Sequence, residues 1–138
     1  MIHTLTKKHL GTLLEAAEIE RTLDDEGDYI AMMAADEDFP YDVHFWFLLD
    51  ETGETLTTVA RCVDLEFDDV LSLANELNHS DLPLKAIADE EDNTIGFNAS
   101  YSVEGLPDEY VSTTCLFNFA AHVWRTYTEL YQNMEDEE

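Results

Sequence analysis

The chain has 138 residues, 45% of them hydrophobic, which suits a single domain with one core. Its 32 Asp and Glu residues against 6 Lys and Arg residues give a formal net charge of -26. A surface of that charge repels phosphate, so we exclude direct nucleic-acid binding and adhesion to anionic membranes as main functions.

The chain shows no signal for export or for a membrane span. The first residues, MIHTLTKKHLGTLLEAA, contain no long apolar stretch after the lysines, and no run of about 18 uncharged apolar residues occurs anywhere. We therefore expect a soluble, cytoplasmic protein. Cys62 and Cys115 lack CxxC spacing and fall inside predicted elements, which favours buried reduced thiols over a disulfide or a zinc site.

The first elements are a helix and a hairpin. Residues 6–18 carry apolar residues at helical spacing, and Thr6 is a suitable N-cap. Residues 24–27 have turn composition, and 29–34 (YIAMMA) predict a strand that pairs with a short extended piece at 19–23.

Two longer strands follow. Residues 42–49 (DVHFWFLL) are apolar at almost every position, which is typical of a central strand covered on both faces. Residues 50–53 supply turn chemistry, and the β-branched residues of 54–62 predict an antiparallel partner strand.

A second helix is predicted from Glu66 to Asn78, with Asp68 and Asp69 in its first turn, where acids favour the positive end of the helix dipole. The helix stops before Pro83, because proline cannot continue it. We expect Asn78 to end the helix in a left-handed conformation or to bond its last carbonyl groups.

Residues 84–88 then predict a strand with Lys85 on its polar side, and 89–93 an acidic hairpin tip. Strict alternation of apolar and polar residues over 95–103 predicts a strand with one buried face.

A last helix is expected from Asp108 to about Asn133. Its apolar residues form two neighbouring stripes, wider than one sheet face requires. The surplus stripe is either covered within the domain or forms a subunit or peptide interface. The residues that would form this interface are Phe117, Trp124, Tyr127 and Tyr131.

These elements predict an α+β fold: a helix, a three-strand antiparallel segment, a second helix, two strands and a C-terminal helix. We expect one domain over residues 1–134 and an acidic tail at 135–138.

Three segments resemble a known family: LSLANELN at 71–78, LPLKAIAD at 82–89, and the strand IGFNASYSV before the aromatic-rich last helix. On these segments the chain resembles the YbjN family of sensory transduction regulators, whose domains share the fold of type III secretion chaperones. The resemblance covers 71–128 well and the first half only by the order of its elements. It implies an α+β domain that tends to dimerise and binds protein, and it brings no catalytic residues.

The residues suited to chemistry do not form a recognisable site. The five histidines share no metal-ligand spacing, and the sequence contains no GxSxG, GxGxxG or GxxxxGK[ST] motif. The acidic stretch DEEDNTIG at 89–96 lacks the alternating ligands of an EF-hand loop. We therefore expect neither an enzyme nor a bound metal or cofactor.

The predicted function is a non-catalytic protein-binding domain, chaperone-like or regulatory, that acts as a homodimer. Its apolar surface is expected on the last helix, with the exposed sheet face as second choice, and an exposed strand edge could accept an extended peptide. The alternative is a DNA mimic, because the charge density permits one. The acids cluster at predicted turns, which favours scattered charge over phosphate-like rows.

Overall fold

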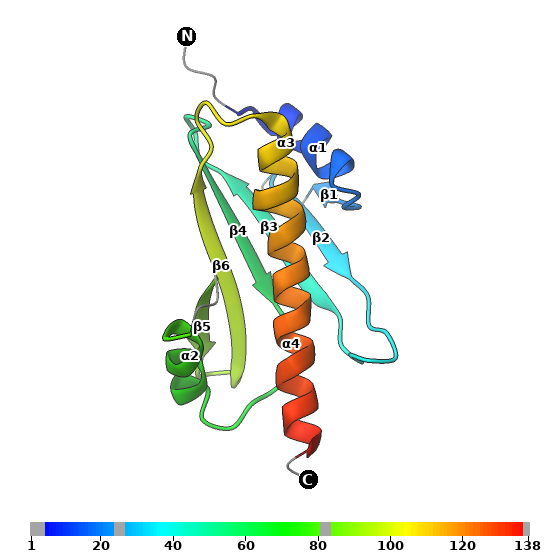
Figure 1. Cartoon of the computed structure of the whole chain (residues 1–138), viewed down its shortest axis with the longest axis vertical. Coiled ribbons are helices and arrows are strands. Elements are labelled where there is room, and N and C mark those ends of the chain that lie inside the picture. The colour runs from blue at the N-terminus through cyan, green and yellow to red at the C-terminus, as the bar shows by residue number, and fades with distance from the viewer. Residues whose placement is uncertain (1–4, 24–26, 81–83, 137–138) are drawn as a thin grey trace.

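The computed structural model describes residues 5–23, 27–80 and 84–136. Its six strands form one antiparallel sheet in the order β1-β2-β3-β4-β6-β5, and a long helix runs across one face of that sheet (Figure 1). The α+β prediction is confirmed. His3, Pro83, most of the predicted turn at 24–27 and residues 137–138 of the predicted tail lie outside the described residues.

The elements have the following bounds: α1 Lys7–Ala16, β1 Thr22–Leu23, β2 Tyr29–Met33, β3 Val43–Leu49, β4 Thr55–Arg61, α2 Val70–Asn78, β5 Lys85–Asp89, β6 Thr94–Ser102, α3 Asp108–Tyr110, the π-helical stretch η1 Val111–Phe117, and α4 Asn118–Asp136. None of the described helices is both long and apolar enough to cross a membrane. α4 continues through Asp136, so the helix extends into the predicted tail.

The division into three strands and two strands is wrong in detail. The short piece Thr22–Leu23 pairs with Tyr29 and Ile30, which confirms the hairpin predicted for 19–23 and 29–34 but makes a fourth strand of the first group. β4 then pairs with β6 along seven residues, from Thr55 to Arg61, and this joins both groups into one sheet.

α1 begins where the sequence predicts. The Thr6 hydroxyl accepts a hydrogen bond of 3.1 Å from the backbone N–H of His9, as an N-cap does. Gly11 lies so close to β2 that a Cβ atom there would stand 2.5 Å from the Tyr29 hydroxyl. The glycine therefore allows α1 to approach the sheet.

α2 begins at Val70, four residues later than predicted. The backbone N–H of Phe67 donates instead to the Asn93 carbonyl at 2.8 Å, which holds residue 67 beside the β5–β6 turn. Asp69, at φ 45°, then caps the helix through a bond from the Ser72 N–H.

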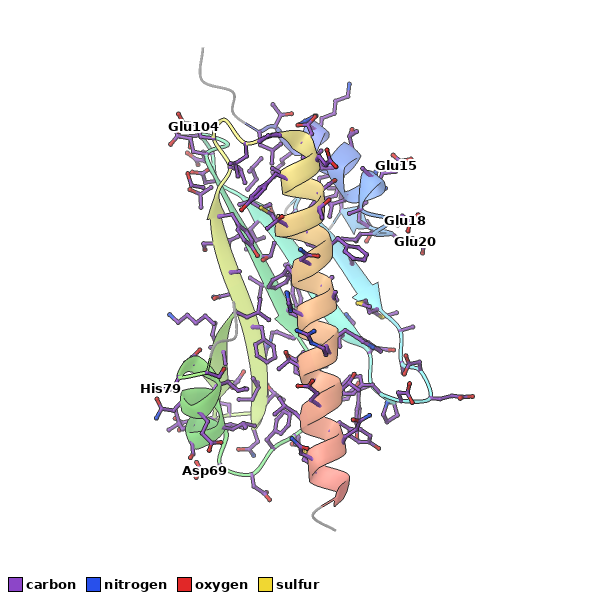
Figure 2. The ribbon with its side chains drawn as sticks, in the orientation of Figure 1. Glu15, Glu18, Glu20, Asp69, His79 and Glu104 are labelled. Atoms are coloured by element: carbon purple, nitrogen blue, oxygen red, sulfur yellow. The ribbon has the colours of Figure 1, made fainter. Side chains whose placement is uncertain are left out.

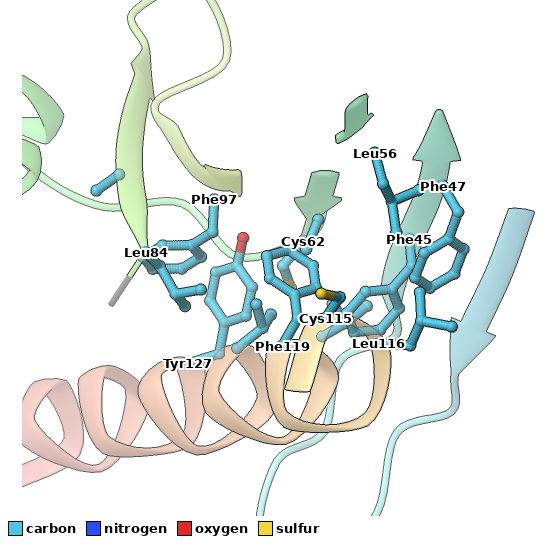
Figure 3. Close-up of a cluster of buried hydrophobic side chains, with 14 of the residues drawn as sticks. Phe45, Phe47, Leu56, Cys62, Leu84, Phe97, Cys115, Leu116, Phe119 and Tyr127 are labelled. Atoms are coloured by element: carbon cyan, nitrogen blue, oxygen red, sulfur yellow. The ribbon is translucent and has the colours of Figure 1, made fainter. Parts of the chain in front are cut away.

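The core lies between the sheet and the last helix. Phe45 and Phe97 from the sheet meet Phe119 and Tyr127 from α4, and all four side chains are buried (Figure 3). Burying each of these large rings contributes on the order of 2 kcal/mol relative to leaving it in water.

The other side of the sheet is open, so the prediction that β3 is covered on both faces is wrong. Phe45 and Phe47 are buried, whereas His44 and Trp46 on the opposite side are only half-buried. α1 contacts Tyr29 and η1 on the core side, and no helix of the described residues packs on the opposite side. We call this side the open face; it comprises Thr22, Ile30, Met32, His44, Trp46, Leu48, Thr55, Thr57, Val59, Arg61, Lys85, Ile87, Asp89, Thr94, Gly96, Asn98, Ser100 and Ser102.

Asn78 has a different role from the one predicted. Its side-chain amide donates to the Ala86 carbonyl at 2.9 Å, and its side-chain oxygen accepts from the Ala86 N–H at 2.7 Å. Ala86 lies on β5, the last strand of the sheet. One side chain therefore satisfies both outward-facing backbone groups of this residue, as a neighbouring strand would.

Candidate protein-binding groove

Two of the four aromatic residues expected at an interface are occupied within the domain. Tyr127 is 0% exposed and its hydroxyl donates to the Ile95 carbonyl, so it belongs to the core and not to a surface. Burial raises the pKa of Tyr127 above its usual value. Tyr131 is half-buried. The centroid of its ring lies 5.9 Å from that of Phe39 and 5.7 Å from that of Tyr41.

Phe39, whose burial nothing in the sequence pattern indicated, covers part of the surplus stripe of α4. It lies between β2 and β3 and is fully buried. Its ring packs edge-on against Trp124 at 5.2 Å and stacks on Tyr127 at 6.0 Å. The part of the stripe from Trp124 to Tyr131 is therefore covered by the loop between β2 and β3.

The part of the stripe near Phe117 stays open and lines a groove. Phe117, at the end of η1, is 51% exposed. Trp124, further along the same helix in α4, is half-buried. The groove has a volume of about 490 Å³. It is lined by Ala17, Glu18, Ile19 and Glu20 after α1, by Ala31, Met32 and Met33 of β2, by Phe45 and Phe47 of β3, and by Phe117, Ala120, Ala121 and Trp124 of the last helix.

The β2 side of the groove includes a strand edge. β1 pairs with β2 only at Tyr29 and Ile30. Over Ala31–Met33 the described residues provide no further strand on that side. A second hollow of about 560 Å³, lined in part by Met32 and Trp46, lies on the open-face side of the same edge. Alternate side chains of an extended segment point to opposite faces, so the two hollows match the geometry of strand addition.

The rim of the groove after α1 is acidic. Glu18 and Glu20 are exposed there, and Figure 2 shows them beside Glu15 on the same side of the molecule. Glu18 has φ 61°, a left-handed conformation that glycine usually occupies after a helix. A side chain in this conformation costs on the order of 1 kcal/mol. The fold thus holds a carboxylate at the rim against its backbone preference.

The histidines are dispersed. His9 bonds Asp108 at 2.8 Å, His79 bonds the Asn75 carbonyl at 2.7 Å, and His122 bonds Arg125 at 2.9 Å. Across residues 5–23, 27–80 and 84–136, no three His, Cys, Asp or Glu side chains come together in a way that could hold a metal ion.

Both cysteines are buried, and burial raises the pKa of each thiol to about 11. Because the thiolate is the reactive form, we expect neither thiol to react with a charged disulfide reagent near pH 8 in the folded protein. Both should react once the chain is unfolded in denaturant. Absorbance of the released chromophore measures this, with exposed Ser72→Cys as positive control. Rapid modification of the native wild-type chain would contradict the expectation.

Comparison of the chain with models of protein families, with curated proteins and with solved structures finds no match.

Proposed function

We propose that this protein is a non-catalytic protein-binding domain, and that it holds an extended, apolar and basic segment of a partner in the groove between β2 and α4. The observation that carries the proposal is the exposed Phe117 above an apolar groove whose β2 side, over Ala31–Met33, is a strand edge that no other described strand covers. An exposed large aromatic beside a concave apolar surface is typical of a binding site.

The charge of the rim supports a basic partner. A segment with lysine or arginine residues beside its apolar ones would place them near Glu18 and Glu20, while its apolar side chains displace water from Phe117 and Trp124. Such binding should weaken with salt, because screening reduces the attraction between exposed charges.

The charge layout favours this function over a DNA mimic. The labelled acids in Figure 2 lie at separate places, with Glu15, Glu18 and Glu20 by α1, Glu104 by the end of β6 and Asp69 at the opposite end of the molecule. A DNA mimic would present its carboxylates in rows at the spacing of phosphates.

A synthetic peptide of alternating leucine and lysine is a suitable probe, with a leucine–glutamate peptide of equal length as control. The two tryptophans, Trp46 and Trp124, lie on different surfaces, so a Trp46→Phe variant reports only on the groove. We expect the basic peptide to shift the Trp124 emission and the acidic peptide to leave it unchanged.

The variant Phe117→Ser tests the site at constant charge. We expect at least about tenfold weaker peptide binding, the scale on which a buried aromatic anchor acts. Leu71→Ser is the matched control, since Leu71 is 57% exposed and lies on α2, away from the groove. Equal affinity of the Phe117→Ser and wild-type chains would show that the basic peptide binds only through diffuse charge, and the proposal would fail.

A further inference from the structure

Glu18 has a backbone conformation that its residue type disfavours. The described residues with a positive φ are Glu18, Gly27, Gly53, Asp69, Asn93 and Gly105. Glycine adopts this region freely, and Asp and Asn tolerate it because their short side chains can bond the local backbone. Asp69 does so here by capping α2. Glu18, at φ 61°, is therefore the member of this set with neither advantage.

The backbone at the end of α1 imposes this conformation. The Ile19 N–H donates to the Leu14 carbonyl at 2.9 Å, and the Glu18 N–H donates to the Glu15 carbonyl at 3.0 Å. These two bonds form a Schellman motif, in which the residue after the helix cap is left-handed and is most often glycine. Glycine would complete the same motif without strain, so the fold does not require a glutamate at this position.

The Glu18 carboxylate does not contribute to the fold through any contact. Within the described residues it forms no hydrogen bond and no ion pair. The nearest cation in the sequence, Arg21, lies 3.7 Å from the Glu15 carboxylate instead. Glu18 is exposed and lines the groove together with Phe117 and Trp124. Its charge is therefore available to a molecule that binds in the groove.

We propose that Glu18 is the specificity-determining residue of the groove, and that its carboxylate selects a segment with a lysine or arginine beside its apolar residues. Strained residues gather at binding sites, where the strain is part of the mechanism. Glu20 also lines the groove, but its backbone is outside the left-handed region, so a glutamate there carries no such strain. The inference rests on the function proposed above and adds that one carboxylate, and not the net charge of the chain, discriminates the partner.

Stability and binding should therefore change in opposite directions at this position. Glu18→Gly removes both the strain and the charge. We expect its midpoint of thermal unfolding to rise by about 2–4 °C, while the leucine–lysine peptide binds about fivefold more weakly. Glu18→Gln removes the charge but keeps a long side chain in the left-handed conformation. We expect this variant to lose the same affinity with little change in its unfolding midpoint.

The experiment compares the leucine–lysine peptide with an uncharged leucine–glutamine peptide of equal length. Trp124 emission in the Trp46→Phe background follows each titration, and the measured quantity is the ratio of the two affinities. We expect both Glu18 variants to lower this ratio about fivefold, because they weaken only the binding of the lysine peptide. Phe117→Ser should weaken the binding of both peptides and leave the ratio unchanged, since the ring contacts leucine in each.

Glu91→Gln is the matched control for net charge. Glu91 is exposed in the turn between β5 and β6, and β5 lies at the opposite edge of the sheet from β1. The variant therefore removes one carboxylate far from the groove. We expect it to leave both the ratio of affinities and the unfolding midpoint at their wild-type values.

Two results would overturn the role of Glu18 alone: a ratio that Glu18→Gln changes no more than Glu91→Gln does, or a Glu18→Gly chain that is less stable than the wild type. In the first case the net charge attracts the peptide, and in the second the side chain supports the fold. The proposed function would survive either result, provided that Phe117→Ser still weakens peptide binding. A wild-type chain that binds neither peptide would refute the proposed function and this inference together.

Discussion

Phe39→Ala is expected to lower the free energy of unfolding by about 3–5 kcal/mol, the usual cost of removing a buried phenylalanine ring. Phe39 contacts the rings of Tyr41, Trp124, Tyr127 and Tyr131, so its loss leaves a cavity among four large side chains. The Asp36 carboxylate accepts a bond from the Phe39 N–H, which fixes the local backbone and limits how far the cavity can collapse.

Urea unfolding followed by far-UV circular dichroism measures this change. Glu37→Ala, at an exposed position of the same loop, is the control and should change stability by less than about 0.5 kcal/mol. A loss below about 1 kcal/mol for Phe39→Ala would mean that the loop does not cover α4 in solution.

Asn78→Ala is expected to cost about 2 kcal/mol, because the N–H and the carbonyl of Ala86 both lose a partner in a partly buried place. Urea unfolding followed by far-UV circular dichroism measures this change too. Asn75→Ala, at an exposed position of α2, removes an amide from the same helix and should be nearly neutral or slightly stabilising, since alanine favours helices.

Asn78→Asp separates the donor from the acceptor. The carboxylate keeps the bond from the Ala86 N–H but faces the Ala86 carbonyl without a proton to donate, which raises the pKa of the new carboxyl group in the folded state. A raised folded-state pKa gives stability that is present in acid and is lost as pH rises through that pKa. The deficit relative to wild type should therefore shrink as pH falls; a deficit that is constant with pH would contradict this geometry.

The local elements were predictable where one periodicity was complete. The alternation from Ile95 to Tyr101 and the apolar spacing of Leu10, Leu13 and Leu14 give β6 and α1 almost to the residue. The pairing of β4 with β6 was not predictable, because those strands are joined through a helix and another strand, and nothing local sets their neighbour.

The groove was predictable only in part. The surplus stripe of α4 pointed to Phe117 and Trp124, but not to Phe39, a single aromatic residue between acids and a proline, whose burial depends on where the loop returns to the sheet. Asn78 resembled a helix end because its real partner, Ala86, is brought to it only by the tertiary fold. The run of apolar residues in β3 does not show which of the two faces of the strand is covered, and His44 and Trp46 are only half-buried on the open face.

The packing of α1 determines when this helix can reach its final contacts as the chain folds. The Leu13 carbonyl accepts a bond of 2.8 Å from the buried Ser112 hydroxyl, and His9 bonds Asp108, so the first helix is held by residues 99 positions further along. Contacts this distant in sequence form late, because a long loop must close before they contribute. During synthesis, the contacts of α1 with η1 therefore form only after η1 has left the ribosome, and the leucines of α1 are incompletely covered until then. The first strands of the sheet do not form a complete fold before that point.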